Sequence, residues 1–286
     1  MEHISVLREE VLHGLDPHAG DRIIDCTLGD GGHTSALLPR VGAVGRVLAI
    51  DLDKQNIDLF KKRYPETLSQ VTPVQGNFSR LRDIALAHGF NSVQGILFDL
   101  GWSSRQFSES GRGFSFMADE PLDMRLDARQ GETAADVLNN RSCEDLERIF
   151  REYGEEPRWR EVAHAVKTRR NRHPFKTTGD LVEVVEGIIK RWGTLHPATR
   201  VFQALRIEVN HELENLQNAL PQALELLAPC GRLAVISFHS LEDRLVKRFY
   251  KQCNGNIITK KPIMASRAEV LKNRRARSAK LRVIQK

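Results

Sequence analysis

Short apolar runs alternate with longer amphipathic stretches over the first hundred residues of the chain. The apolar runs predict buried strands at residues 22–26, 46–51, 71–75 and 95–100. The amphipathic stretches predict helices at residues 6–15, from 35, at 54–64 and at 81–88. Strands that are apolar throughout and separated by helices indicate a parallel sheet covered on both faces. We therefore expect a doubly wound α/β fold with right-handed crossovers.

This alternation stops after the fourth strand. From residue 109 to 196 the sequence is charged and helical, with amphipathic helices expected at 145–152, 161–170 and 181–190. A long helix from 198 through 216, a second helix ending near 228–231 and a fifth strand at 232–238 follow, and the last strands are expected near 256–259 and 280–284. We expect a sheet domain in two parts, residues 1–108 and 197–286, around a helical insertion at 109–196.

The loop after the first strand is the first candidate for a ligand site, because open parallel sheets bind ligands beyond the carboxyl ends of their strands. It reads DCTLGDGGHT, from Asp25 to Thr34. Glycines at 29, 31 and 32 permit a tight turn and let a ligand approach the backbone closely. Such a loop is weakly specific, since a plain strand-to-helix turn uses the same residues.

The second strand makes the loop more informative. It ends in Asp51, twenty residues after Gly31, where a carboxylate can accept hydrogen bonds from the ribose hydroxyls of an adenosine. Sites for dinucleotides and for S-adenosylmethionine share this feature. Thr34 stands where the dinucleotide fingerprint has its third glycine, and Asp25 suits a cationic ligand that bears an amine. These two residues favour S-adenosylmethionine, and a dinucleotide-dependent oxidoreductase is the alternative.

Two further residues follow strands at the same edge of the predicted sheet. Phe78 comes after the third strand, where an aromatic ring can pack on an adenine or simply fill the core. Asp99 ends the fourth strand, where cofactor and substrate would meet.

The basic residues are unevenly distributed. The net charge is +6, yet residues 260–286 alone hold ten Lys or Arg against Glu269, so the rest of the chain is slightly acidic. A second stretch, 158–176, holds seven cations against Glu161. One such run is usually a solvated face, but two indicate a polyanionic partner. The candidates for phosphate contacts are Arg169, Arg170, Arg172, Arg274, Arg275 and Arg277.

Cysteine usage and hydropathy exclude several other classes of protein. The four cysteines are scattered without a CxxC pair, so neither a disulfide framework nor a zinc site is expected, and no metal-ligand spacing is apparent. No apolar run approaches the roughly 20 residues that span a bilayer, and the first residues show no secretory signal. We expect a cytoplasmic protein without membrane partners; a homodimer is possible, but the sequence does not determine the oligomeric state.

Several long segments resemble the RsmH (MraW) family of bacterial rRNA N4-cytosine methyltransferases, nearly from end to end. They include DCTLGDGGHT (25–34), GILFDLGWSSRQ (95–106), HPATRVFQALRIEVNHEL (196–213), GRLAVISFHSLEDRLVKRF (231–249) and RARSAKLRV (275–283). The resemblance implies a Rossmann-like class I S-adenosylmethionine-dependent methyltransferase with a helical insertion domain. It also implies methylation of the N4 amine of a cytidine in the decoding region of 16S rRNA, in the small ribosomal subunit.

The family's cofactor contacts fall on residues that match its motifs in this sequence. They are Gly31, Gly32, His33, Asp51, Phe78, Asp99 and Gln106. Trp102 and Arg105 depart from the usual Val and Pro of the segment that follows the fourth strand.

A catalytic hypothesis follows from the chemistry of the cytosine amine, a poor nucleophile whose lone pair is delocalised into the ring. An acceptor for the amine hydrogens would aim the nitrogen at the methyl group and favour the positive charge that develops there. Asp99, or a main-chain carbonyl in residues 100–103, is the candidate acceptor, although Asp99 can equally face the cofactor alone. Phe238 and His239, after the fifth strand, are candidates for stacking on the base and for contacting its phosphate. A non-catalytic RNA-binding protein that retains a cofactor pocket is a further alternative.

Overall fold

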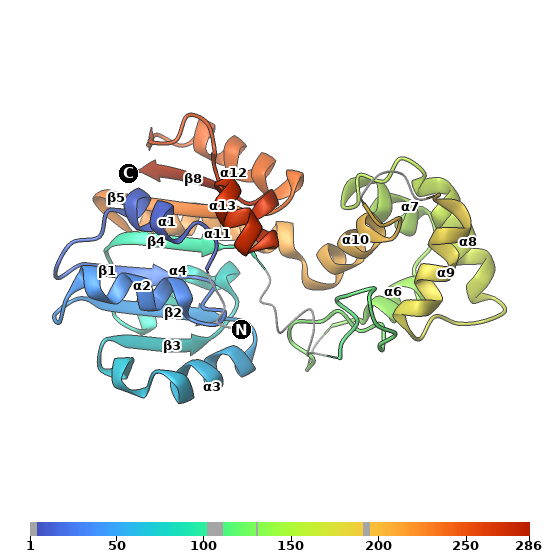
Figure 1. Cartoon of the computed structure of the whole chain (residues 1–286), viewed down its shortest axis with the longest axis horizontal. Coiled ribbons are helices and arrows are strands. Elements are labelled where there is room, and N and C mark those ends of the chain that lie inside the picture. Colours follow the sequence, from blue (N-terminus) through green and yellow to red (C-terminus); the bar gives the residue numbers. More distant parts are fainter. Residues whose placement is uncertain (1–4, 102–110, 130, 191–194) are drawn as a thin grey trace. The chain divides into compact units, whose positions relative to one another are not determined.

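The structure is a computed structural model that describes residues 5–101, 111–129, 131–190 and 195–286 (Figure 1). The chain divides into two compact units. One comprises Met1–Trp102 with Leu213–Lys286 and is called the sheet unit here; the other, Ser103–Glu212, is called the helical unit.

The sheet unit is built on an eight-stranded sheet in the order β3-β2-β1-β4-β5-β8-β6, with β7 also paired to β8. The strands are β1 (Arg22–Asp25), β2 (Arg46–Asp51), β3 (Val71–Gln75), β4 (Val93–Asp99), β5 (Leu227–Ser237), β6 (Asn256–Ile257), β7 (Ile263–Met264) and β8 (Lys280–Gln285). The first five strands are mutually parallel, and β8 runs antiparallel to β5. The predicted parallel sheet is thus confirmed. β5 begins five residues before the expected 232, where the end of a helix was expected, and β7 was not predicted.

Helices cover both faces of this sheet, as its uniformly apolar strands require (Figure 1). One face packs on α1 (Arg8–Leu15), α2 (Gly32–Val41) and α3 (Lys54–Arg63), the other on α4 (Leu81–Ala87), α11 (Glu212–Leu226) and α12 (Ser240–Gln252). Alternate residues of a strand point to opposite faces of the sheet. In β4, Ile96 and Phe98 pack in the core under α4, α11 and α12, and Leu97 packs in the core under α1 and α2. Short helices complete the unit: η1 (Pro65–Ser69), η2 (Phe78–Arg80), α13 (Arg267–Lys272) and η3 (Arg274–Ser278).

Within the described residues of the helical unit lie the three amphipathic helices expected from the sequence and two others. The expected ones are α7 (Cys143–Glu152), α8 (Trp159–Arg170) and α9 (Thr178–Ile188). α6 (Ala134–Asn140) was not predicted, although Thr133 and Asp136 form a capping box whose Thr-x-x-Asp pattern is visible in the sequence.

The fifth helix of this unit, α10 (Thr199–Asn210), corrects the prediction of a long helix through residue 216. That helix is interrupted at His211, whose φ of 50° places it in the left-handed region, and α11 begins at the next residue. Histidine tolerates this conformation better than most residues. The helix therefore ends without the glycine or proline that would have indicated the break in the sequence. Because α10 packs on α6 and α7, the compact unit ends at Glu212 rather than at the expected residue 196.

A buried ion pair fastens the antiparallel strand β8 to α12. Arg282 donates from Nε to Oδ1 of Asp243 over 2.7 Å and from Nη2 to Oδ2 over 3.3 Å, with side chains only 9% and 14% exposed. Burial alone would raise the pKa of Asp243, but the hydrogen bonds and charge of Arg282 lower it below its ordinary value.

Replacing this carboxylate tests how far β8 depends on the pair. Asp243→Ala leaves the buried guanidinium of Arg282 without its partner. We expect this change to lower the free energy of unfolding by about 3 kcal/mol at pH 7. Because the folded pKa is depressed, the difference from wild type should disappear as the pH falls through that lowered value. Urea unfolding from pH 7 down to pH 3 measures it.

The matched control is Asp58→Ala, which removes the exposed partner of Lys54 on α3. It should change the free energy of unfolding by less than about 1 kcal/mol. Equal losses in the two variants would contradict a special role for the buried pair.

Candidate cofactor and active site

The candidate site lies at the carboxyl ends of β1, β2 and β4. β1 lies between β2 and β4, so chain connections leave it in both directions, which is the switch point where such sheets bind ligands. The glycine loop after β1 is fixed to both neighbouring strands: the amide of Cys26 donates to Leu97, and that of Leu28 donates to Ile50.

A buried carboxylate holds this loop from within. Asp25 is fully buried; its Oδ2 accepts the hydroxyl of Thr34 over 2.7 Å, and its Oδ1 accepts the amide of Thr27 over 3.1 Å. Burial raises the pKa of Asp25 despite the opposing effect of His33 and these hydrogen bonds. In the sequence, Asp25 suits a cationic ligand that bears an amine; the structure shows its oxygens buried and hydrogen-bonded within the loop. Thr34, at the position of the third glycine of the dinucleotide fingerprint, supplies one of these bonds.

The three glycines of the loop serve different purposes. A Cβ on Gly31, whose φ is +82°, would overlap the ring of Phe60, and a Cβ on Gly32 would overlap the hydroxyl of Ser5. At Gly29, whose φ is +52°, a Cβ would meet only the Thr27 carbonyl at 3.9 Å. Packing against the protein thus requires glycine at 31 and 32, while Gly29 is the position with open space beside it.

Asp51 lies at the tip of β2 and binds the glycine loop directly. Its Oδ2 accepts the amide of Gly29 over 2.8 Å and the side-chain amide of Asn56 over 3.0 Å, and its Oδ1 accepts the amide of Asp53 over 2.8 Å. A carboxylate offers about four acceptor positions, so room remains for one strong bond from a ligand hydroxyl. Burial raises the pKa of Asp51 to about 6 against the effect of these bonds.

Asp99 forms a second acidic centre, at the end of β4. Its amide donates to the Thr27 hydroxyl over 2.7 Å, and its Oδ1 accepts the amide of Gly101 over 3.1 Å. Its Oδ2 lies 3.3 Å from Nε2 of His33, with 20% of the Asp99 side chain exposed and 6% of the His33 side chain. Burial would lower the pKa of His33, but Asp99 and Asp25 outweigh it and raise the pKa above its ordinary value. Gly101 and His33 thus orient the Asp99 carboxylate and Thr27 holds its main chain, while the carboxylate remains accessible.

Two aromatic side chains border this region. The ring of Phe78 is half-buried and meets Phe98 edge-on, with centroids 5.5 Å apart. The ring of Phe238 lies so close to Gly101 that a Cβ there would come within 2.7 Å of it. Phe238 also packs on the core, so the predicted stacking face is only partly exposed.

His239 has a local structural role that sequence reasoning missed. It is the N-cap of α12, where Nδ1 accepts the amide of Glu242, and Nε2 lies 3.1 Å from the carboxylate of the same residue. Both ring nitrogens therefore face Glu242, and a phosphate contact would have to replace one of these interactions. The His-x-x-Glu spacing at the end of a strand was the available signal.

The six candidate arginines divide into three groups. Arg169 binds Asp180 on α9 and lies 4.8 Å from the centroid of the Phe175 ring, while Arg170 donates to the carbonyls of Leu138 and Arg141. These two hold the helical unit together. Arg275 is half-buried, and burial lowers its pKa against the attraction of Asp30 in the glycine loop. The exposed members are Arg172, Arg274 and Arg277.

The remaining positions singled out from the sequence fall beyond what the structure describes. Gln106, Trp102 and Arg105 lie within 102–110, outside the described residues.

The strand order, the glycine loop at the switch point and the carboxylates that follow β2 and β4 define a Rossmann-like enzyme that binds an adenosine-containing cofactor. Comparison with known proteins identifies the family within this class of enzymes. The chain belongs to the MraW methylase family, whose profile matches residues 1–286.

Curated relatives agree along the whole chain. It is 43% identical to the ribosomal RNA small subunit methyltransferase H of Brevibacillus brevis, over 99% of this chain and 98% of that protein. The proteins of the same name from Thermomicrobium roseum and Dehalococcoides mccartyi are 44% and 43% identical, again over 99% of this chain and over 93% and 86% of theirs.

Family membership decides between the alternatives left open by the loop. The chain is a methylase, as Thr34 and the motif resemblance predicted, and nothing in the comparisons favours a dinucleotide-dependent oxidoreductase or a non-catalytic protein. Among the helices described, none combines the length and apolarity needed to cross a membrane.

The bond between Thr34 and Asp25 can be tested without touching the exposed part of the site. Thr34→Val keeps the shape but leaves a fully buried carboxyl short of a donor, so we expect a loss of about 2 kcal/mol in the free energy of unfolding. Thr34→Ser keeps the hydroxyl and should lose no more than about 1 kcal/mol. Denaturant unfolding compares the two, and a valine variant as stable as the serine variant would disprove the role assigned to the bond.

Proposed function

We propose that this enzyme transfers a methyl group from S-adenosylmethionine to the N4 amine of a cytidine in the decoding region of 16S rRNA. The observation that carries the proposal is the setting of Asp99 at the end of β4. Its accessible carboxylate accepts the amide of Gly101 and faces His33, while its main-chain amide is held by the Thr27 hydroxyl. The names of the relatives, all small-subunit rRNA methyltransferases, support the same substrate. A ribosomal substrate also supports a cytoplasmic location.

The residues around the glycine loop fit the proposed cofactor. Gly29 has open space beside it, and Asp51 retains acceptor capacity for a ribose hydroxyl. Phe78 offers the exposed part of its ring to the adenine, and His33 lies beside Asp99 at the start of α2. S-adenosylmethionine supplies an electrophilic methyl group, so the protein's main task is alignment. Gly31, Gly32 and Gln106 remain proposed contacts, the first two through their backbone.

Asp99 suits the demands of the cytosine amine. Bond formation at N4 draws the lone pair out of the ring and leaves the nitrogen positively charged until a proton departs. A carboxylate that accepts an amine hydrogen orients the lone pair and stabilises that charge. His33 acts as a positioning residue, because its Nε2 faces Asp99 Oδ2 and limits rotation of the carboxylate. Phe238, packed against Gly101, is proposed to border the target base.

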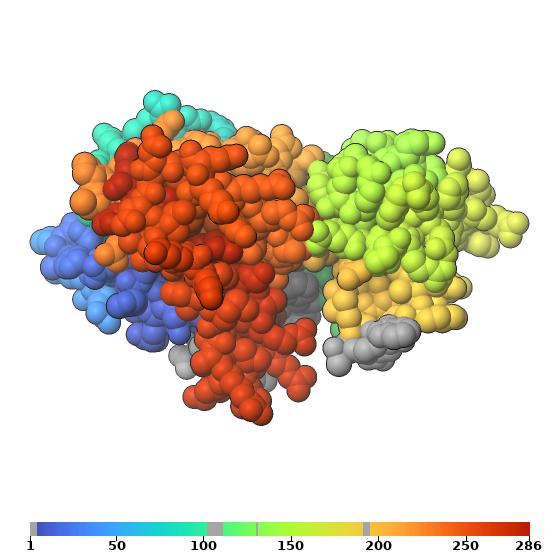
Figure 2. Space-filling model, turned by 90° about the horizontal axis from the view of Figure 1, so that it is seen from above, coloured from blue at the N-terminus to red at the C-terminus, as the bar shows by residue number. Residues whose placement is uncertain are grey.

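Exposed cations support the proposed RNA contact. Arg274 and Arg277 lie in η3, and Arg172 follows α8 in the helical unit. Figure 2 shows part of the orange-to-red C-terminal segment protruding at one edge of the view. Phosphate contacts of this kind are salt-dependent and insensitive to sequence. Selectivity for one cytidine must then come from the shape of the RNA and from a target base that is unstacked. Methylation at N4 also requires the base to leave its stack.

Asp99→Ala is the direct test of the proposed function. We expect turnover to fall by about 100-fold or more, because the amine loses its acceptor, while the affinity for cofactor falls far less. Small subunits incubated with isotope-labelled S-adenosylmethionine, followed by mass-spectrometric mapping of the modified cytidines, give both the position and the rate. Asp83→Ala, which removes an exposed carboxylate from α4, is the control. Methylation at another nucleotide would overturn the proposal, and unchanged turnover in Asp99→Ala would eliminate this role for Asp99.

The basic C-terminal segment has its own test. Arg274→Gln combined with Arg277→Gln should reduce the slope of log affinity against log salt for RNA binding by about 1.5, since each lost phosphate contact removes roughly 0.7–0.9. Lys61→Gln combined with Lys62→Gln removes the same charge from the exposed side of α3 and should leave the slope unchanged. Identical slopes in the two double variants would show that η3 does not contact the backbone.

A further inference from the structure

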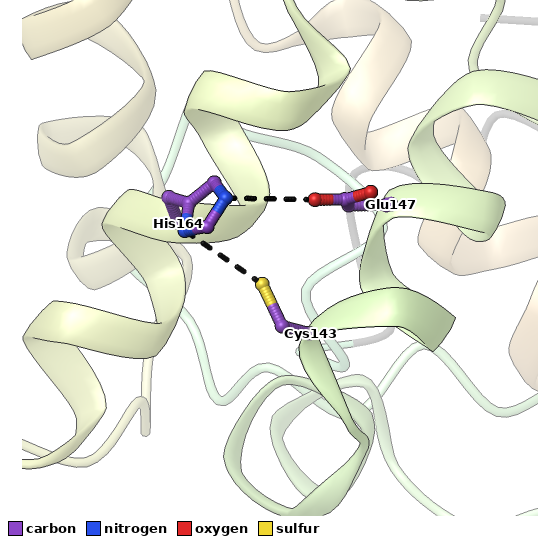
Figure 3. Close-up of side chains that lie close together, drawn as sticks. All are labelled: Cys143, Glu147 and His164. Carbon is purple, nitrogen blue, oxygen red and sulfur yellow. Dashed lines mark hydrogen bonds and ion pairs between the residues drawn. The ribbon is translucent and has the colours of Figure 1, made fainter.

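A group of three potential metal ligands lies between two helices of the helical unit, remote in sequence from the glycine loop. Cys143 and Glu147 come from α7 and His164 comes from α8, and Figure 3 shows the imidazole facing both the thiol and the carboxylate. One ligand atom from each residue lies within 4.8 Å of the other two. The proposed methyl transfer makes no use of this group.

The separations are close to those of a metal-bound set. Sγ of Cys143 lies 4.0 Å from Nδ1 of His164, and Nε2 of the same ring lies 3.6 Å from Oε1 of Glu147. Tetrahedral zinc with its usual bond lengths keeps thiolate, imidazole and carboxylate atoms roughly 3.2–3.8 Å apart. These two contacts use different nitrogens of the ring, so the imidazole must turn for a single nitrogen to bind the ion. Because one ligand atom from each residue already lies within 4.8 Å of the other two, side-chain rotation can bring a nitrogen, the sulfur and an oxygen to a common centre.

The backbone favours this arrangement. Cys143 and Glu147 are four residues apart on α7, so they lie on the same side of that helix, one turn apart. α7 packs directly on α8, which presents His164 to them. Two ligands on one helix and a third on its neighbour form a bridge that neither helix could provide alone.

The exposure of the three side chains suits an ion held at the edge of the unit. Cys143 is buried, Glu147 is 25% exposed and His164 is 67% exposed. His164 also borders an open groove of about 550 Å³ lined by Thr168, Arg172 and His173. Water can therefore reach the imidazole, which leaves a fourth coordination position to solvent.

We propose that Cys143, Glu147 and His164 form a binding site for a zinc-like divalent cation that bridges α7 and α8. A thiolate and an imidazole select borderline-soft ions such as Zn²⁺ over Mg²⁺ or Ca²⁺, and three protein ligands with a water complete a tetrahedron. Binding replaces the thiol proton, which passes to solvent, by the metal. The bound ion stabilises the packing of the two helices.

This site was not predicted because its ligands have no recognisable spacing in the sequence. Cys143 and His164 are 21 residues apart, and Glu147 is one of many acidic residues in the charged region. Only the packing of α7 on α8 brings them together.

Cobalt provides a spectroscopic test on the full-length protein after treatment with a chelator. We expect one equivalent of Co²⁺ to produce a thiolate-to-cobalt charge-transfer band in the near ultraviolet and the visible bands of tetrahedral cobalt, both abolished by added Zn²⁺. Cys143→Ser should lose the charge-transfer band. His164→Gln, a change at an exposed side chain that leaves the core intact, should weaken Co²⁺ affinity at least tenfold.

Matched controls separate this site from incidental thiols and histidines. Cys230→Ser removes the exposed cysteine of β5, and His13→Gln removes an exposed histidine of α1; both should keep the full spectrum. Zn²⁺ should also raise the melting temperature of wild type by several degrees but not that of His164→Gln. Absence of the charge-transfer band in wild type, or its persistence in Cys143→Ser, would overturn the proposal.

Discussion

The enclosure of one carboxylate, Asp25, is the constraint on which the cofactor site depends. Its hydrogen bonds from Thr34 and Thr27 set the path of the glycine loop between β1 and α2. Thr27 then uses its hydroxyl to receive the amide of Asp99, so the same loop also fixes the end of β4. Gly29 donates to Asp51 and thereby joins the tip of β2. Through short polar links, a single buried acid on β1 thus determines where the acids at the ends of β2 and β4 lie.

Much of the sheet unit could be predicted because its signals are local. Apolar runs predicted β1 to β4 to within two residues, and the positions of Asp51 and Asp99 at strand ends followed directly. β5 begins at Leu227, five residues before the expected start, because its first half carries polar and turn residues. The break at His211 could not be predicted, since a non-glycine residue in the left-handed region leaves no compositional mark. The boundary of the helical unit was misplaced for the same reason, because it falls at that break rather than at the start of a helix.

The roles of individual polar residues were harder to foresee than the fold. Arg169 and Arg170 are adjacent in a basic run, yet both are engaged within the helical unit, and only the neighbouring Arg172 is exposed. His239 was read as a substrate contact because it follows a strand, but its ring caps α12. In each case the sequence correctly identified a polar or charged position, while the partner was a residue or carbonyl from another element. Which cations remain for a nucleic acid is therefore decided by tertiary packing.

The position of the helical unit within the chain has a consequence for biosynthesis. Residues 103–212 separate β4 from β5, which are neighbours in the sheet, and β8 comes later still. During translation, the edge of β4 that pairs with β5 therefore stays unpaired until more than a hundred further residues have left the ribosome. The helical unit, which is compact by itself, is free to fold in that interval. Its early compaction would bring the two ends of the interrupted sheet closer together and shorten the search by β5 for its place.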